Sequence, residues 1–304
     1  GVCFRKDGQS HEVRARREVL LTAGAINSPK ILELSGIGRA DVLSSLGIPV
    51  VHAMAGVGEN LQDHLQLRTV YGVSNALTLN QKANSLIGKL AMGLEYALRR
   101  SGPLSMAPSQ LGMFSRSDDS RETPDLEYHV QPLSTDKLGD PLHPYPAITV
   151  SVCNLRPESV GSTHSTSIDC DVQPDIRLNY LTAESDRIVA LKSIAQVRKI
   201  MQAEALKQYS PKELLPGPTV TSDTDLHHAI GNIATTIFHP IGTCKMGQDD
   251  RAVVNDRLQV HGLDGLRIVD ASIMPKIVSG NTASPVVMIA EKAAEMIMEG
   301  HKTQ

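Results

Sequence analysis

One histidine stands between an apolar run and a turn rich in Gly, Pro and Thr, in the stretch TTIFHPIGTCKMG at residues 235–247. Three kinds of chemistry fit His239: a catalytic base, a metal ligand shared with Cys244, or a hydrogen-bonded core histidine. Pro240 restricts His239 to an extended backbone, and Gly242 allows the chain to turn away. We therefore expect a ring presented from a fixed edge, which leaves the base and the core histidine open.

A metal site is the weakest of these interpretations. Zinc needs three or four ligands in a compatible cluster, and no second His/Cys pair lies near Cys244 in the sequence. We expect no metal. Two further polar residues follow: Asp270 ends the apolar run LRIVD, and Asn281 lies in SGNTASP just before a helix start. Asp270 and Asn281 are also ordinary cap or turn residues. Taken alone, neither they nor His239 make a convincing functional residue.

The composition is that of an ordinary globular protein, with 304 residues, 41% hydrophobic and 21% charged. A net charge of −3 and basic runs no longer than two residues argue against a nucleic-acid partner. Four scattered cysteines with no CxxC favour a reducing compartment. The sequence contains no run of 18 apolar residues, so it predicts no transmembrane segment. We expect a cytoplasmic protein, and peripheral attachment at the inner membrane stays open.

The two ends of the chain have α/β patterns. Val2–Arg5, a Lys6-Asp7-Gly8 turn and residues 12–21 predict a hairpin, whose last part, EVLLTAG, is typical of a buried strand. The next segment predicts a helix capped by Ser28 and ended by Gly36. Near the other end, LRIVDAS (266–272) predicts a buried strand. A helix then begins at Ser284-Pro285, with an apolar stripe of Val286, Ile289, Ala290, Ala293 and Ile297.

The middle of the chain predicts an α+β unit. LEYHVQ (126–131) and AITVSVCN (147–154) predict strands, and residues 181–207 a long helix with Leu191, Ile194, Val197 and Met201 facing inward. Residues 84–100 predict an amphipathic helix with an apolar stripe of Leu86, Ile87, Leu90, Leu94 and Leu98. Ser222 and Asp225 form a capping-box pattern for one more helix. The order α/β, α+β, α/β suggests one domain inserted into another.

Five ordered motifs resemble the glucose-methanol-choline oxidoreductase family, especially its choline dehydrogenase-like bacterial branch. They are GAINSPKILELSGIG (24–38), GVGENLQDH (56–64), HPIGTCKMG (239–247), VVNDRLQVHGLDGLRIVDASIMP (253–275) and SGNTASPVVMIAEKAAEMI (279–297). The resemblance covers nearly the whole chain, thinly from about 65 to 230. In the family GxGxxG stands at the extreme N-terminus. None of the glycine pairs here continues as GxGxxG, so the resemblance implies a C-terminal portion of a longer enzyme.

The resemblance implies a fold and a division of the chain. The fold is a partial α/β FAD-binding domain, glutathione-reductase-like, with an inserted α+β substrate-binding domain built on an antiparallel sheet. Residues 1–64 are the first FAD-binding segment, 65–230 the substrate-binding domain, and 231–304 the last FAD-binding segment with the catalytic residues.

The resemblance also implies the site. His239 matches the active-site histidine, and Asn281 its partner, with an alcohol hydroxyl between them above the flavin. A neutral imidazole can accept the hydroxyl proton, and an Asn amide can stabilise the developing alkoxide. The residues implied to lie beside FAD are Ala23, Gly24, Asn60, His64, Asp270, Ala271, Thr282 and Ala283. One departure is Ala283, where the branch usually has Asn.

The implied activity is oxidation of a small-molecule alcohol to an aldehyde or ketone. The electron acceptor is left open among oxygen, a quinone and a carrier protein. One alternative is a hydroxynitrile lyase on the same scaffold. Another is that the 304-residue chain in isolation is inactive and flavin-free, since half a cofactor site loses most of the affinity.

Overall fold

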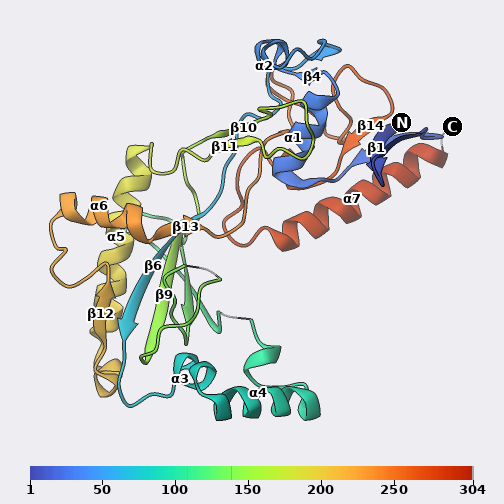
Figure 1. Ribbon diagram of the computed structural model, residues 1–304. Coiled ribbons are helices and arrows are strands. Elements are labelled where there is room, and N and C mark those ends of the chain that lie inside the picture. Colours follow the sequence, from blue (N-terminus) through green and yellow to red (C-terminus); the bar gives the residue numbers. More distant parts are fainter. Residues whose placement is uncertain (108, 138, 303–304) are drawn as a thin grey trace. The chain divides into compact units, whose positions relative to one another are not determined.

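The computed structural model describes residues 1–107, 109–137 and 139–302. The chain forms two compact units (Figure 1). The first contains residues 1–63, 156–182 and 238–304, and the second contains 64–155 and 183–237. These boundaries differ from the predicted segments: residues 156–182 lie in the first unit, and residue 64 and residues 231–237 lie in the second. The reason is pairing, since Leu61 bridges Gly161 and β10 (Ser162–His164) pairs with β11 (Asp175–Arg177) in the first unit.

The first unit begins with the predicted hairpin. β1 (Val2–Lys6) pairs antiparallel with β2 (Gln9–Val13) across a two-residue turn. Asp7 and Gly8 have φ values of 52° and 77°, the left-handed conformation that such hairpin turns require. The predicted second strand splits here, because β3 (Val19–Leu21) leaves the hairpin and pairs in parallel with β14 (Leu266–Ile268).

Helix α1 (Gly24–Leu34) begins four residues before the predicted cap. A residue distant in sequence accepts the hydrogen bond of a backbone amide in its first turn: Gly24 N donates to Asp270 Oδ2 at 2.9 Å. Ser28 is therefore inside the helix, as is Pro29, which has no N–H to bond the carbonyl of Ala25. Thr243 Oγ1 donates to that carbonyl instead, at 2.5 Å. The predicted end is confirmed: Gly36 has φ 79°.

The core of the first unit lies between these strands and the last helix, α7 (Ala283–Lys302). Ile268, Val253 and Cys244 are fully buried there, and Ile289 and Ala293 of α7 pack on the same cluster. Ala290, which we placed on the apolar stripe, is exposed. The smaller elements of the unit are β4 (Ile37–Gly38), α2 (Ala40–Ser45), β5 (His52–Ala53) and η3 (Ala271–Ile273).

The second unit is built on an antiparallel six-stranded sheet. Its order is β12-β6-β9-β8-β7, with β13 also pairing with β6. β8 (Leu126–Gln131) and β9 (Ala147–Asn154) have the predicted bounds. The other strands are β6 (Leu65–Gly72), β7 (Leu111–Ser115), β12 (Lys212–Leu215) and β13 (Ala234–Thr236).

One face of this sheet is apolar and is covered by α5 (Glu184–Met201) and α6 (Asp223–Ile233). Leu67, Val152 and Tyr128 lie in one row across β6, β9 and β8, and Tyr128 donates its hydroxyl to Gln196 of α5 at 2.6 Å. The predicted inward residues Ile194, Val197 and Met201 are buried, as are Leu226, Ile230 and Ile233 of α6. The 3₁₀ turn η2 (Glu204–Tyr209) follows α5.

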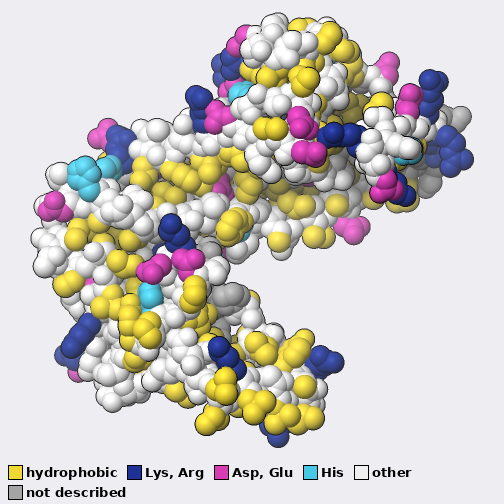
Figure 2. Space-filling model, in the orientation of Figure 1, with side chains coloured by type: hydrophobic (Ala, Val, Ile, Leu, Met, Phe, Trp, Pro, Cys, Tyr) yellow, Lys and Arg dark blue, Asp and Glu magenta, His cyan; other side chains and the backbone are white. Residues whose placement is uncertain are grey.

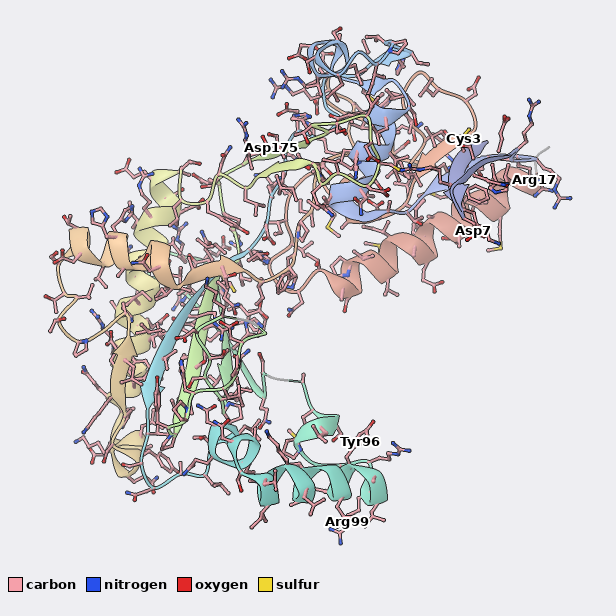
Figure 3. The ribbon with its side chains drawn as sticks, viewed as in Figure 1. Cys3, Asp7, Arg17, Tyr96, Arg99 and Asp175 are labelled. Carbon is pink, nitrogen blue, oxygen red and sulfur yellow. The ribbon has the colours of Figure 1, made fainter. Side chains whose placement is uncertain are left out.

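The predicted amphipathic helix forms, but nothing in the described residues covers its apolar stripe. α4 (Leu86–Arg99) forms after α3 (Leu79–Asn84) and before η1 (Pro103–Ser105), but its apolar stripe is exposed, from 57% at Leu94 to 85% at Leu86. Figure 2 shows hydrophobic side chains gathered over this helix, and Figure 3 labels Tyr96 and Arg99 on it. Periodicity gave the helix but could not give its burial, because burial depends on what packs against it.

Across the residues that the structure describes, no helix has the length and apolarity needed to cross a bilayer.

Candidate active site

His239 follows a strained residue and is held by its own backbone. Phe238 has φ 65°, a left-handed conformation that costs a bulky residue about 1–2 kcal/mol. The next amide, His239 N, donates to Asp63 Oδ1 at 2.8 Å, and the His239 side chain is 9% exposed. Strain of this kind persists only where the surrounding structure determines it, and it is concentrated at functional sites.

Asn281 lies beside the imidazole of His239. Its Nδ2 is 3.3 Å from Nε2 of the ring. An amide nitrogen only donates, so in this arrangement Nε2 accepts, as the unprotonated nitrogen of a neutral imidazole does. The structure therefore brings together the two residues that the resemblance paired, although 42 positions separate them in the sequence.

Two amide side chains from the GENLQDH loop connect the segments that carry this pair. Asn60 Nδ2 donates to the carbonyl of Gly242 at 3.2 Å, and Gln62 Nε2 donates to that of Pro275 at 3.2 Å. Gln62 Oε1 also accepts from Ile277 N at 3.1 Å. The loop thus ties the turn after His239 to the segment that leads to Asn281.

Asp63 and Tyr180 are parts of the site that sequence reasoning missed. Both carboxylate oxygens of Asp63 are engaged, Oδ1 by His239 N and Oδ2 by the hydroxyl of Tyr180. Asp63 is 4% exposed, and Tyr180 lies 117 residues further along the chain. The only signal was that Asp63 belongs to GVGENLQDH; nothing local to the sequence shows that it faces His239.

Four of the predicted cofactor residues lie at the carboxyl ends of the parallel strands β3 and β14. Ala23 and Gly24 follow β3, and Asp270 and Ala271 follow β14. Ligands in α/β folds bind outside this edge of a sheet. Gly24 has φ 81°, and a Cβ built there would meet nothing within 4 Å, so a ligand could approach the backbone closely.

The carboxylate of Asp270 organises this edge. Its Oδ2 accepts from Gly24 N at 2.9 Å and from Ser28 Oγ at 2.6 Å, and its Oδ1 accepts from Ser272 N at 2.8 Å. It is 6% exposed. Asp270 thereby caps η3, the kind of role that the sequence left open, and it also fixes the first turn of α1 against the end of β14, which the sequence did not indicate.

The other predicted cofactor residues are in different surroundings. Thr282 is largely buried and its carbonyl accepts from Val286 N, while Ala283 is the exposed first residue of α7. Asn60 turns its amide toward protein carbonyls. The ring of His64 is fully buried in the second unit, with Nε2 3.2 Å from the carbonyl of Leu155. The contacts of Asn60 and His64 with a cofactor remain predictions.

Cys244 packs in the core of the first unit. It is fully buried, and burial raises the pKa of its thiol well above the ordinary range. Within the described residues, the one group of three close metal-ligand side chains is Asp169, Cys170 and Asp171. It is exposed and is already contacted by the guanidinium of Arg5.

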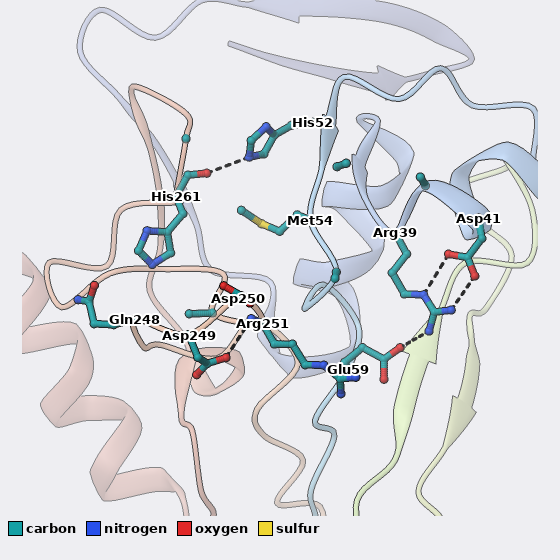
Figure 4. Close-up of a pocket in the computed structure, with 15 residues that line it drawn as sticks. Arg39, Asp41, His52, Met54, Glu59, Gln248, Asp249, Asp250, Arg251 and His261 are labelled. Atoms are coloured by element: carbon teal, nitrogen blue, oxygen red, sulfur yellow. Dashed lines mark hydrogen bonds and ion pairs between the residues drawn. The ribbon is translucent and has the colours of Figure 1, made fainter.

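A cavity of about 990 Å³ lies elsewhere in the first unit (Figure 4). It is lined by residues of α2, β5 and the 248–252 loop, and none of the predicted site residues lines it. Three of its charged side chains are paired with one another, since Arg39 forms ion pairs with both Asp41 and Glu59. This network raises the pKa of Arg39 and lowers that of Asp41 to about 2, mainly through their mutual hydrogen bond.

The chain matches two family models, both described as GMC oxidoreductase, over residues 1–66 and 157–290. It is 39% identical over 297 residues to an oxygen-dependent choline dehydrogenase of Chromohalobacter salexigens, covering 98% of this chain and 53% of that protein. It is 41% identical over 299 residues to the mitochondrial choline dehydrogenase of Homo sapiens, covering 98% and 50%. The chain thus spans about half the length of these relatives.

Comparison with solved structures supports the same family. A structure from a study of FAD modification in formate oxidase of Aspergillus oryzae RIB40 superposes with a TM-score of 0.90 at 28% identity, covering 97% of this chain and 56% of that one. The predicted fold, a partial α/β FAD-binding domain with an α+β domain on an antiparallel sheet, is confirmed. From its two family models, its relatives and its fold, the chain belongs to the GMC oxidoreductase family.

Proposed function

We propose that the protein catalyses FAD-dependent oxidation of a small-molecule alcohol to an aldehyde or ketone. The observation that carries the proposal is the pairing of Asn281 Nδ2 with His239 Nε2 at 3.3 Å. An acceptor nitrogen and a donor amide side by side can address the same substrate oxygen. The names of the relatives, choline dehydrogenase and formate oxidase, support redox chemistry.

In this proposal His239 is the base and Asn281 the electrostatic partner. Nε2 takes the hydroxyl proton of the alcohol, which in similar reactions accelerates turnover by roughly 10²–10⁴-fold. The Asn281 amide donates to the same oxygen as negative charge develops on it. Asp63 holds the backbone of His239, so the ring keeps its position during proton transfer.

Bound FAD would supply the acceptor of the hydride that leaves the carbon atom. The residues proposed to meet it are Ala23, Gly24, Asp270, Ala271, Thr282 and Ala283. Open space beside Gly24 at the carboxyl ends of β3 and β14 fits such a group. The amino-terminal end of α7 carries partial positive charge, which favours a cofactor that becomes negative on reduction.

The variant His239→Ala tests the proposal in the full-length protein. Turnover of a primary alcohol is expected to fall by on the order of 10²-fold or more while the flavin stays bound. His11→Ala, which removes an exposed histidine from β2, serves as the matched control. The bacterial relative is named an oxygen-dependent enzyme, so oxygen uptake is the first assay. Unchanged turnover in His239→Ala would overturn the assignment.

A further inference from the structure

The sheet of the second unit has a second face, which is polar and largely buried. Side chains alternate along a strand, so the residues between Leu67, Tyr128 and Val152 lie on the face away from α5. The buried apolar residues Val70, Ala147 and Cys153 lie on this face too. We call it the polar face, and its polar members are Gln66, Arg68, Glu127, His129, Gln131, Thr149 and Ser151. Of these, His129 is half-buried and the others are buried. A buried sheet face is normally apolar, so this composition needs an explanation.

Arg68 on β6 is the most unusual member. It is 6% exposed, and neither Nη1 nor Nη2 has a hydrogen-bond partner among the described residues. Its cross-strand neighbour is Ser151, and the next residue in the row is His129. Burial lowers the pKa of the guanidinium, and no acidic neighbour opposes that effect. A buried cation without a partner is costly, so proteins rarely keep one without a use.

Unpartnered acceptors lie on the same face, on β8. Glu127 Oε2 and Gln131 Oε1 are buried without a hydrogen bond among the described residues. The other oxygen of Glu127, Oε1, lies 3.3 Å from His129 Nε2. β9 separates β6 from β8, so the backbones that carry the donors and the acceptors are roughly 10 Å apart. The polar face thus offers a cationic fork at one side and acceptors at the other.

We propose that the polar face binds a small hydroxy-carboxylate, with its carboxylate on the Nη1 and Nη2 atoms of Arg68. The planar guanidinium matches a carboxylate with two parallel hydrogen bonds. A hydroxyl elsewhere in the ligand donates to Glu127 or Gln131. The positive charge of Arg68 disfavours a quaternary ammonium group, such as that of choline, the compound named for the relatives, beside its guanidinium, and the opposite charge of Glu127 lies two strands away.

Anaerobic calorimetry on the full-length protein with its flavin already reduced, so that alcohol probes are not oxidised, tests this site by binding alone. The probes are 4-hydroxybutanoate, butane-1,4-diol, which is neutral and of the same length, and choline. The wild type is expected to bind 4-hydroxybutanoate at least tenfold more tightly than either of the others. Arg68→Gln is expected to lose at least tenfold in affinity for 4-hydroxybutanoate, and Arg68→Lys to keep part of it, because Lys retains the charge without the fork.

Arg99→Gln is the matched control, because it removes the same charge from an exposed residue of the same unit. It is expected to bind 4-hydroxybutanoate like the wild type. If Arg68→Gln does not fold, competition in the wild type decides: acetate should displace 4-hydroxybutanoate and tetramethylammonium should not. Equal affinity for the three probes, equal affinity in Arg68→Gln, or displacement by tetramethylammonium would overturn the proposal and leave ordered water as the partner of Arg68.

Discussion

Three buried carboxylates of the first unit have partners at both oxygens, as Asp125 has in the second unit, whereas two charged residues on the polar face of the second unit do not. In the first unit, Asp63, Asp270 and Glu33 are largely or fully buried, and both oxygens of each carboxylate accept hydrogen bonds. In the second, Arg68 and Glu127 are equally buried, yet atoms of both have no partner among the described residues. A satisfied buried charge fixes the backbone, whereas an unsatisfied one points to a ligand.

The largest effect expected from this contrast is at Asp270. The variant Asp270→Ala leaves Gly24 N, Ser28 Oγ and Ser272 N without their acceptor at the edge where α1 meets β14. We expect the free energy of unfolding of the full-length protein to fall by about 3–5 kcal/mol, because several buried donors lose their acceptor, and the flavin content to fall with it. Urea denaturation measures the first quantity and visible absorbance the second. As a control, the variant Asp249→Ala changes an exposed carboxylate and should be as stable as the wild type. An equal loss of unfolding free energy in both variants would contradict the role assigned to the buried Asp270.

The second effect is smaller and depends on pH. His164 Nδ1 lies 2.7 Å from Glu33 Oε1, and Nε2 lies 3.3 Å from Glu59 Oε1. The bond to Glu33 raises the pKa of His164 above its ordinary value of about 6.5. The folded state therefore binds the proton more tightly than the unfolded state. This contribution to stability is complete below about pH 6.5 and is lost as the pH rises through the folded pKa.

His164→Gln is expected to cost about 2 kcal/mol of unfolding free energy at pH 6, and progressively less at higher pH. Urea denaturation of both proteins between pH 6 and 9 gives the difference. His11→Gln, on the exposed hairpin, is the control. A difference that grows with pH would contradict the assigned direction.

The smallest effect is expected at Thr243. Its hydroxyl donates to the carbonyl of Ala25, which Pro29 leaves without a helical partner. Thr243→Val keeps the shape of the fully buried side chain and leaves that carbonyl unsatisfied, at a cost of about 1–2 kcal/mol. Thermal denaturation should detect it as a lowered Tm. Thr243→Ser keeps the hydroxyl, so its Tm should fall less. An equal fall in Tm in the two variants would show that the hydrogen bond to Ala25 does not cause the loss of stability.

Local patterns predicted the elements better than they predicted their surroundings. β8 and β9 have the predicted bounds because the periodicity of a strand is written in the strand itself. The start of α1 was misplaced because it depends on Asp270, 246 residues away. The apolar stripe of α4 was predicted but its exposure was not, because the spacing of the stripe says nothing about what packs on it.

The candidate site was accessible to sequence only through the order of its motifs. Spacing alone could not distinguish a catalytic His239 from the more common core histidine, and the resemblance supplied Asn281 as its partner. Asp63 and Tyr180 were missed, because their contacts join residues more than 100 positions apart. Arg68 was missed too, since a lone arginine in an alternating strand is ordinary until its burial and lack of partners are known.

The central claim, that His239 acts on an alcohol for hydride transfer to flavin, is tested most directly by anaerobic mixing. The full-length protein and its His239→Ala variant, both with bound FAD, are mixed with a primary alcohol while the visible flavin absorbance is followed. We predict that the wild-type flavin bleaches and that the variant bleaches on the order of 10²-fold more slowly or more. Equal rates in the two proteins, or no bleaching of the wild type by any alcohol, would contradict the account.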